Sequence, residues 1–158
     1  MQKKSFKYLA LGDSYTIGES VTEKDRWPNQ LAEKLSIPKP RIIATTGWRT
    51  DDLKGAMDAA NLSNDYDLVS LSIGVNNQYQ AKPTTQYEVE FEELLKRAIE
   101  LAKGNSKNVF VVSIPDYGFT PFGKPKQETI TPQIDQFNEI NKRITEKYKI
   151  SYFDITEI

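Results

Sequence analysis

The feature that most constrains the fold is the regular alternation of short apolar segments with amphipathic ones along the whole sequence. Apolar residues dominate five segments that are typical of buried strands: residues 6–11, 41–45, 67–73, 108–114 and 150–155. Between them, apolar residues recur at the spacing of helices. Strands that alternate with helices form a parallel sheet through right-handed crossovers, with helices on both faces. The sequence therefore predicts one α/β domain over residues 1–158, built on a five-stranded parallel sheet.

Local signals place the starts of the expected helices. Pro28 fits the first turn of the helix that follows the first strand. Thr50 is expected to cap the next helix, and Thr85 with Glu88 is expected to form a capping box at the start of the third. The dipeptide Thr131-Pro132 is expected to open the last helix, after an irregular loop.

Composition excludes several classes of function. The chain has no cysteine, which excludes disulfides, thiolate chemistry and Cys-ligated zinc. Its net charge is −1, so the overall balance gives no electrostatic reason to expect nucleic acid or an anionic membrane as partner. No apolar run approaches membrane-spanning length, and no signal peptide is visible. The compartment stays unknown: cytoplasmic, or exported with the signal removed.

The first expected strand ends on Gly12-Asp13-Ser14, inside the stretch LALGDSYTIGES. Sites in parallel sheets form at the carboxyl edge, where strands end and loops begin. A glycine there allows a tight turn, and a helix that starts soon after it aims backbone N–H groups at the loop. Ser14 is therefore a candidate nucleophile. The alternative is that Asp13 or Ser14 only caps a turn or helix.

Two further strand ends supply hydrogen-bond donors. Gly47 follows the second strand and lets a backbone N–H approach a ligand closely, while Asn76 follows the third and carries an amide donor. Each could also belong to an ordinary turn. Together, a hydroxyl, a glycine N–H and an amide at three strand ends are what acyl transfer needs: a nucleophile with converging donors for a tetrahedral oxyanion.

These segments resemble the SGNH hydrolases, also called GDSL-type esterases and lipases, over the whole chain. LALGDSYTIGES resembles their first block, TTGWRTDDL the second and SIGVNNQYQ the third, whose common form is Gly-x-Asn-Asp, so that Asn77 departs from it. The resemblance implies a flavodoxin-like three-layer fold and hydrolysis of small carboxylic esters through an acyl-enzyme. It implies Ser14 as nucleophile, the N–H groups of Ser14 and Gly47 with the Asn76 side chain as oxyanion hole, and no cofactor or metal. We expect the sheet order 2-1-3-4-5.

The resemblance also implies an Asp-x-x-His block after the last strand, followed by a closing helix. The sequence ends at Ile158 without that block and contains no histidine, so the catalytic Asp and His are absent from it. The ordinary pKa of Asp13 makes it a poor base for an alcohol, and Asp154 is typical of a strand end. We therefore expect the gene to continue past Ile158 and the domain given by this sequence to be C-terminally incomplete and nearly inactive.

A missing closing helix would also leave apolar strand positions such as Leu9 and Leu71 uncovered. Exposed patches of that kind favour homo-oligomers. Aromatic residues in and near the loop PDYGFTPFGKPKQ are candidates to line an acyl or alcohol pocket, unless they only pin the loop to the domain. They are Trp48, Tyr79, Tyr117, Phe119 and Phe122.

Two other functions remain open from the sequence. The first is a catalytically inactive SGNH-fold binding module, which would keep the fold and the oxyanion donors but not the catalytic machinery. The second is a nucleotide-binding flavodoxin-like protein. GDSYTIGES lacks the Gly-x-x-x-x-Gly-Lys-Ser/Thr pattern of phosphate loops, and nucleotide binding would leave GVNNQYQ unexplained.

Overall fold

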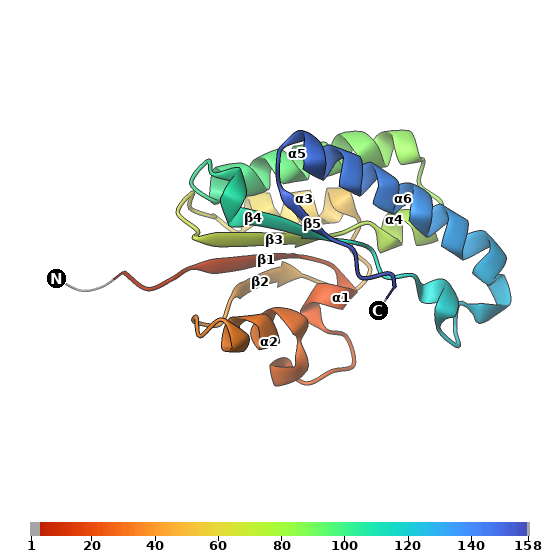
Figure 1. Ribbon diagram of the computed structural model, residues 1–158, viewed down its shortest axis with the longest axis horizontal. Coiled ribbons are helices and arrows are strands. Elements are labelled where there is room, and N and C mark those ends of the chain that lie inside the picture. The colour runs from red at the N-terminus through yellow and green to blue at the C-terminus, as the bar shows by residue number, and fades with distance from the viewer. Residues whose placement is uncertain (1–3, 158) are drawn as a thin grey trace.

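The computed structural model describes residues 4–157, so residues 1–3 and Ile158 of the predicted domain lie outside it. Its five strands form one parallel sheet in the order β2-β1-β3-β4-β5, which confirms the predicted topology (Figure 1). Leu9, in the strand between β2 and β3, pairs with Arg41 on one side and Val69 on the other. The strands are β1 (Tyr8–Gly12), β2 (Arg41–Ala44), β3 (Leu68–Ser72), β4 (Val109–Val112) and β5 (Ser151–Phe153).

Three long helices cover one face of the sheet (Figure 1). They are α3 (Thr50–Ala59), α5 (Thr84–Leu101) and α6 (Gln127–Lys147), with the short α4 (Val75–Tyr79) at the carboxyl edge. Alternate strand residues such as Leu9 and Leu71 point into this layer and are fully buried there, as is Phe91 of α5. Burial of each such side chain contributes about 1.5–3 kcal/mol, so this face holds the main core.

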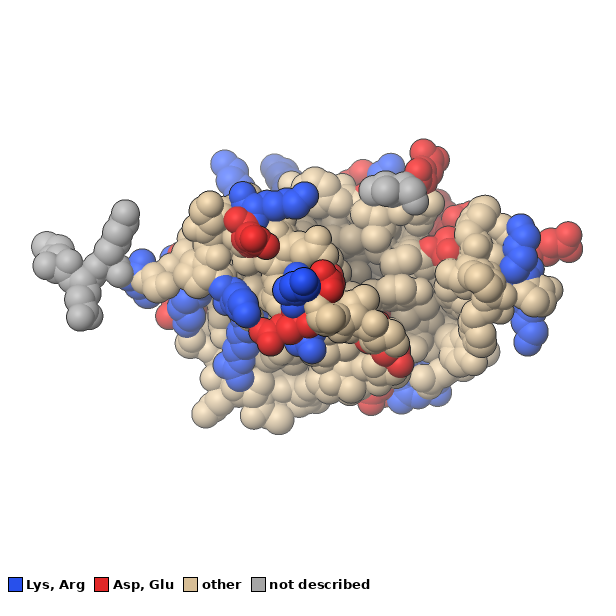
Figure 2. Space-filling model, turned by 90° about the horizontal axis from the view of Figure 1, so that it is seen from below, with Lys and Arg blue, Asp and Glu red and all other residues tan. Residues whose placement is uncertain are grey.

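The opposite face is only partly covered. The helix α2 (Trp27–Lys34) packs its apolar side against Tyr8 and Ala10 of β1, and α1 (Ser14–Ile17) follows β1 directly. Beside them lies a cavity of about 590 Å³, which we call the sheet groove, and Figure 2 shows the hollow on this face. Its lining contains no charged residue: Tyr15, Trp27, Leu31, Leu35, Leu68, Ser72, Phe110, Val112, Pro115, Phe153 and Ile155.

The prediction that Leu9 and Leu71 are uncovered is wrong. Both are fully buried under α3, α5 and α6, because their side chains point to the covered face. The uncovered side chains belong to the alternate strand residues that point to the opposite face, such as Phe110. Phe153 on the same face is 54% exposed. The sequence shows which strand residues alternate, but not which of the two faces lacks a helix.

The helix α3 begins at Thr50, so the prediction that Thr50 caps it is wrong. The N-cap is Arg49, whose backbone N–H donates to the Asp52 carboxylate at 3.0 Å. The Thr50 hydroxyl donates instead to Glu90 of α5, a partner forty residues away. A long-range hydrogen bond has therefore replaced the local one that the sequence pattern favours.

Two other helix starts also differ from the predictions. Thr85 lies inside the first turn of α5, and Glu88 forms an ion pair with Arg143 of α6 at 2.7 Å rather than a capping box. The last helix, α6, begins at Gln127, before the predicted Thr131-Pro132 start. Short 3-10 turns at Tyr117–Phe119 and Lys124–Lys126 occupy the preceding loop. No helix in residues 4–157 is long and apolar enough to cross a membrane.

Candidate active site

The turn after β1 presents Ser14 at the carboxyl edge of the sheet. Asp13 is the N-cap of α1, and its carboxylate accepts the backbone N–H of Tyr15 at 3.1 Å. Gly12 is required because a Cβ there would lie 2.7 Å from the carbonyl oxygen of Ser72. Ser14 is half-buried, and within residues 4–157 its hydroxyl makes no hydrogen bond. The hydroxyl of the nucleophile candidate therefore has no hydrogen-bond partner among the described residues.

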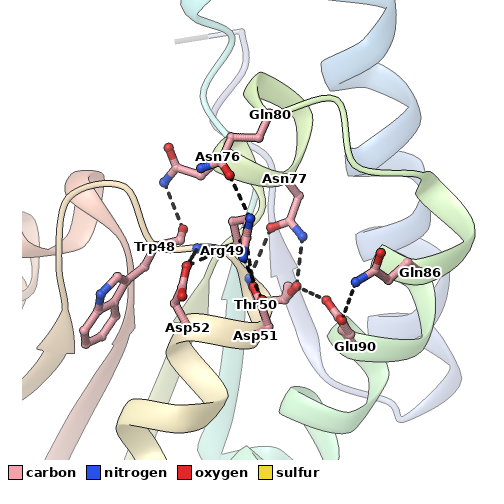
Figure 3. Close-up of polar contacts among 10 residues, drawn as sticks. All are labelled: Trp48, Arg49, Thr50, Asp51, Asp52, Asn76, Asn77, Gln80, Gln86 and Glu90. Carbon is pink, nitrogen blue, oxygen red and sulfur yellow. Dashed lines mark hydrogen bonds and ion pairs between the residues drawn. The ribbon is translucent and has the colours of Figure 1, made fainter.

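The turn after β3 places Asn76 opposite this serine. Gly74 has φ +135°, and a Cβ there would lie 2.7 Å from Ile114 Cδ1, so this turn also needs glycine. Asn76 lies in α4, and its Nδ2 donates to the backbone carbonyl of Trp48 at 2.9 Å (Figure 3). This bond uses one of the two amide hydrogens and leaves the other available to a ligand.

Gly47 lies one residue before Trp48, next to the point where Asn76 contacts the chain. Its φ is +85°, a left-handed conformation that glycine adopts easily. Its backbone N–H makes no hydrogen bond within the part of the chain that the structure describes. The turn after β2 therefore offers a free N–H group on an exposed loop near Asn76.

A cavity of about 310 Å³ brings Ser14 and Asn76 together. Tyr79 and Tyr117 also line it, as does Phe122; these three rings pack against one another with centroids 6.3–6.4 Å apart, and we call them the aromatic ridge. The remaining lining residues are Tyr15, Val75 and Thr120.

Two of the predicted pocket residues do not line this cavity. The Trp48 side chain packs against the main core. Only the backbone carbonyl of this residue contacts Asn76. Phe119 is 68% exposed at the end of a 3-10 turn, and Phe122 of the same loop lines the cavity with the two tyrosines.

A second cavity of about 440 Å³ lies on the other side of the aromatic ridge. Two glutamines that the sequence analysis did not single out support the ridge there. The Tyr117 hydroxyl donates to Gln78 Oε1 at 2.6 Å, and Gln78 Nε2 donates to Gln133 Oε1 at 2.7 Å. Gln78 lies in the SIGVNNQYQ segment and Gln133 lies in no quoted block, and only the three-dimensional contacts show that both support the ridge.

The two carboxylates considered as bases have different environments. Burial raises the pKa of Asp13 to about 7, against the opposing effect of the Tyr15 N–H. The pKa of Asp154 is lowered, first because its carboxylate accepts the backbone N–H and the hydroxyl of Thr156. Asp154 therefore acts as a strand-end cap. The argument that Asp13 has an ordinary pKa is wrong, because only the fold shows how deeply the residue is buried.

The Asp13 carboxyl should make stability depend on pH. Its pKa rises from 3.8 to about 7 on folding, so the folded state holds the proton more tightly. This contribution is present below pH 4 and is lost as the pH rises through 7. Asp13→Asn keeps an acceptor for the Tyr15 N–H without the charge. The variant should gain on the order of 2–4 kcal/mol over wild type between pH 4 and pH 8, measured by urea unfolding.

Asp154→Asn is the matched control for this experiment. Because its pKa is lowered in the fold, removal of this carboxylate should not stabilise the protein at neutral pH. Parallel pH profiles for wild type and Asp13→Asn would show that Asp13 titrates as an ordinary exposed carboxylate.

Comparison with known proteins finds one matching family. The model of the GDSL-like Lipase/Acylhydrolase family matches residues 10–158. No curated protein matches the sequence. Among solved structures, phospholipase A1 from Streptomyces albidoflavus NA297 is similar with a TM-score of 0.72 and 20% identity, over 94% of this chain and 79% of that one.

Two further solved structures show the same fold. A putative lipolytic protein of the G-D-S-L family from Desulfitobacterium hafniense DCB-2 has a TM-score of 0.73 and 19% identity, over 95% of this chain and 77% of that one. AlinE4, described as an SGNH-hydrolase family esterase, has a TM-score of 0.68 and 18% identity, over 96% and 77% of the two chains.

Proposed function

The chain belongs to the GDSL-like lipase/acylhydrolase family, and from this premise we propose that it is a serine hydrolase that cleaves small carboxylic esters through an acyl-enzyme. The observation that carries the proposal is the cavity that Ser14 and Asn76 line together at the carboxyl edge of the sheet. Ser14 Oγ would bond to the ester carbonyl carbon, the alcohol would leave with a proton, and water would then release the acid from Ser14.

The oxyanion that forms in each step needs several donors. The Asn76 amide has one hydrogen bonded to the Trp48 carbonyl, which holds its plane, and the second is available to the oxyanion. The backbone N–H groups of Ser14 and Gly47 complete the proposed set. Donors that are held in place before the reaction stabilise developing charge without the cost of reorientation.

The proposed reaction also needs a base to take the Ser14 proton. Asp13 has a suitable pKa of about 7, but its carboxylate is turned into the fold and makes no hydrogen bond with the Ser14 hydroxyl in residues 4–157. The sequence contains no histidine. We therefore propose that the base is not part of the given sequence, and that this polypeptide alone hydrolyses esters very slowly.

A fluorophosphonate probe tests the nucleophile without requiring turnover. Ser14 Oγ should form a bond to phosphorus with loss of fluoride, slowly because no base assists. Intact-mass measurement over hours should show a single adduct that peptide mapping assigns to Ser14, and Ser14→Ala should remove it. Ser20→Ala, at an exposed serine of the next turn, should label like wild type. An adduct that persists in Ser14→Ala would exclude Ser14 as the nucleophile.

The alternative function is an SGNH-fold binding module without catalysis. The observation that favours it is that the given sequence contains the proposed oxyanion donors but no histidine. A module of this kind would show no Ser14 adduct and would still bind an ester or its acid product in the 310 Å³ cavity.

We also propose that two copies associate through the sheet groove. Parallel sheets are normally covered on both faces, and this groove is lined only by uncharged residues, with Leu35 and Phe153 more than half exposed. Phe153→Asp should shift the protein toward monomer in sedimentation velocity. Val89→Asp, at an exposed apolar residue of α5 away from the groove, should not. A wild-type monomer at high concentration would refute this association.

A further inference from the structure

A chain of polar contacts, buried at Asn77 and Thr50 and reaching the surface at Gln86, joins three helices beside the proposed oxyanion donors (Figure 3). Asn77 of α4 is 2% exposed, and its Oδ1 accepts the backbone N–H of Thr50 at 3.2 Å. Its Nδ2 donates to Thr50 Oγ1 at 2.9 Å. The Thr50 hydroxyl donates to Glu90 Oε2, and Glu90 Oε1 accepts from Gln86 Nε2 at 2.8 Å.

The donor and acceptor groups of Asn77, Thr50 and Glu90 determine the direction of each hydrogen bond between these three residues. The Thr50 backbone N–H can only donate, so the oxygen of the Asn77 amide must face it, and the nitrogen must face Thr50 Oγ1. The Thr50 hydroxyl has one hydrogen, which the Glu90 carboxylate requires because that group can only accept. Position 77 must therefore supply a donor to Thr50 Oγ1, which an ionised aspartate cannot do.

The same residues connect two of the proposed oxyanion donors. The segment Trp48–Thr50 directly follows Gly47, and three side-chain contacts tie it to α4 and to Gln80, the residue that caps the end of α4. Asn76 Nδ2 donates to the Trp48 carbonyl at 2.9 Å, Arg49 donates to Gln80 Oε1 at 2.9 Å, and Asn77 binds the backbone N–H and the hydroxyl of Thr50. The Asn77 contact is the only one of these three that is buried. Of the three contacts between this segment and the residues 76–80, it is therefore the one best shielded from water.

We propose that Asn77, Thr50 and Glu90 are positioning residues of the oxyanion hole, and that Asn77 and Glu90 are a matched pair. The effect of these residues on catalysis rests on the proposed function, whereas the pairing of Asn77 with Glu90 does not. Where the third block reads Gly-x-Asn-Asp, a carboxylate would stand at position 77; here that position is an amide, and the carboxylate that meets the Thr50 hydroxyl is Glu90 of α5. An aspartate at 77 beside Glu90 would leave two carboxylates facing the single Thr50 hydroxyl hydrogen.

The pairing can be reversed by exchange of the two groups. In Asn77→Asp with Glu90→Gln, the carboxylate at 77 accepts both the Thr50 N–H and the Thr50 hydroxyl. The amide at 90 then donates to Thr50 Oγ1, so every group again has a partner. The double variant should therefore behave like wild type, although Asn77→Asp alone does not.

A double-mutant cycle in urea unfolding tests the pair without reference to catalysis. Asn77→Asp should raise the unfolding constant by roughly tenfold to a hundredfold, because one oxygen of the buried carboxylate is left without a donor. Addition of Glu90→Gln should return it to within about threefold of wild type. If Asn77→Asp does not fold, recovery of a folded double variant is the same result. Additive losses, or a double variant that also fails to fold, would overturn the pairing.

Two measurements on the folded proteins test positioning. Asn77→Asp should slow fluorophosphonate labelling of Ser14 by about tenfold or more, and the double variant should recover the wild-type rate. Ile144→Val, a core change in α6, should lower stability without slowing labelling. The side-chain amide signals of Asn76 in ¹H–¹⁵N spectra should shift in Asn77→Asp and return in the double variant.

The two measurements separate this inference from the proposed function. If Ser14 of the wild type is not labelled at all, the proposed function fails, while the unfolding cycle and the Asn76 signals still decide whether the pair holds the loops. If labelling and the Asn76 signals stay unchanged in folded Asn77→Asp, these residues do not position the oxyanion hole and the inference is overturned.

Discussion

Imidazole added to the 158-residue polypeptide should restore Ser14-dependent hydrolysis of p-nitrophenyl acetate, which the polypeptide alone should catalyse barely above the buffer rate. Loss of the histidine base from a serine hydrolase lowers kcat by about a millionfold. That corresponds to about 8 kcal/mol on the barrier, more than the oxyanion donors can supply. Free imidazole can reach Ser14 because the 310 Å³ cavity beside it is open to solvent.

Ser14→Ala is the essential control, because imidazole itself cleaves this ester. The rate for wild type minus that for Ser14→Ala should rise with imidazole concentration and level off as the cavity fills. Rapid Ser14-dependent turnover without imidazole would mean that a residue of this chain is the base. Asp13→Asn would then be the first variant to test, since the pKa of Asp13 is raised to about 7. No rescue and no Ser14 adduct would favour the binding module.

Removal of the Asn76 amide should slow fluorophosphonate labelling of Ser14 by about a hundredfold to a thousandfold, the usual effect of losing one oxyanion donor. Asn76→Ala deletes the only side-chain donor proposed for the oxyanion. The loss should be large because the Trp48 carbonyl already holds the amide in place, so its full effect is available in the transition state. The measurement is the rate of adduct formation by intact mass.

Two variants control for effects other than the donor. Asn76→Asp keeps the size of the side chain but replaces the donor by a negative charge, so it should label at least as slowly as Asn76→Ala. Asn64→Ala, at an exposed asparagine that precedes β3 whereas Asn76 follows it, should label like wild type. If Asn76→Ala labels at the wild-type rate, Asn76 is not an oxyanion donor and the proposed acyl transfer loses its main support.

The strands and the strand ends could be predicted from the sequence because the strands of a parallel sheet carry apolar residues toward both faces and so give continuous apolar segments, here even where one face is only partly covered. The positions of Ser14, Gly47 and Asn76 follow from that pattern, and their shared edge follows from the parallel order. Helix starts are harder to predict. A local rule gives the residue types that favour a helix start, but it does not show the long-range partners, such as Glu90 for Thr50, that compete for the same side chains. Pro132 lies within α6, although proline favours the first turn.

Other properties depend on contacts that no local pattern contains. The Thr50 hydroxyl serves Glu90, and the aromatic ridge is held by Gln78 and Gln133, which come from different helices. The raised pKa of Asp13 depends on how much of the domain surrounds it. Whether Leu9 faces a covered or an open side depends on where the helices pack, which strand alternation leaves undetermined.

The sheet order β2-β1-β3-β4-β5 suits a protein that folds while it is being synthesised. β1 leaves the ribosome first and can take β2 on one side and β3 on the other, after which β4 and β5 add in turn to the growing edge. No strand has to enter between two that are already paired. The nascent chain emerges at about 5–20 residues per second, so the edge of β4 stays unpaired for several seconds while α6 is translated. A ribosome that stalls within α6 would therefore leave the backbone N–H and C=O groups along one side of β4 unpaired. Because the side chains of β4 are apolar, this strand could then pair with a neighbouring nascent polypeptide.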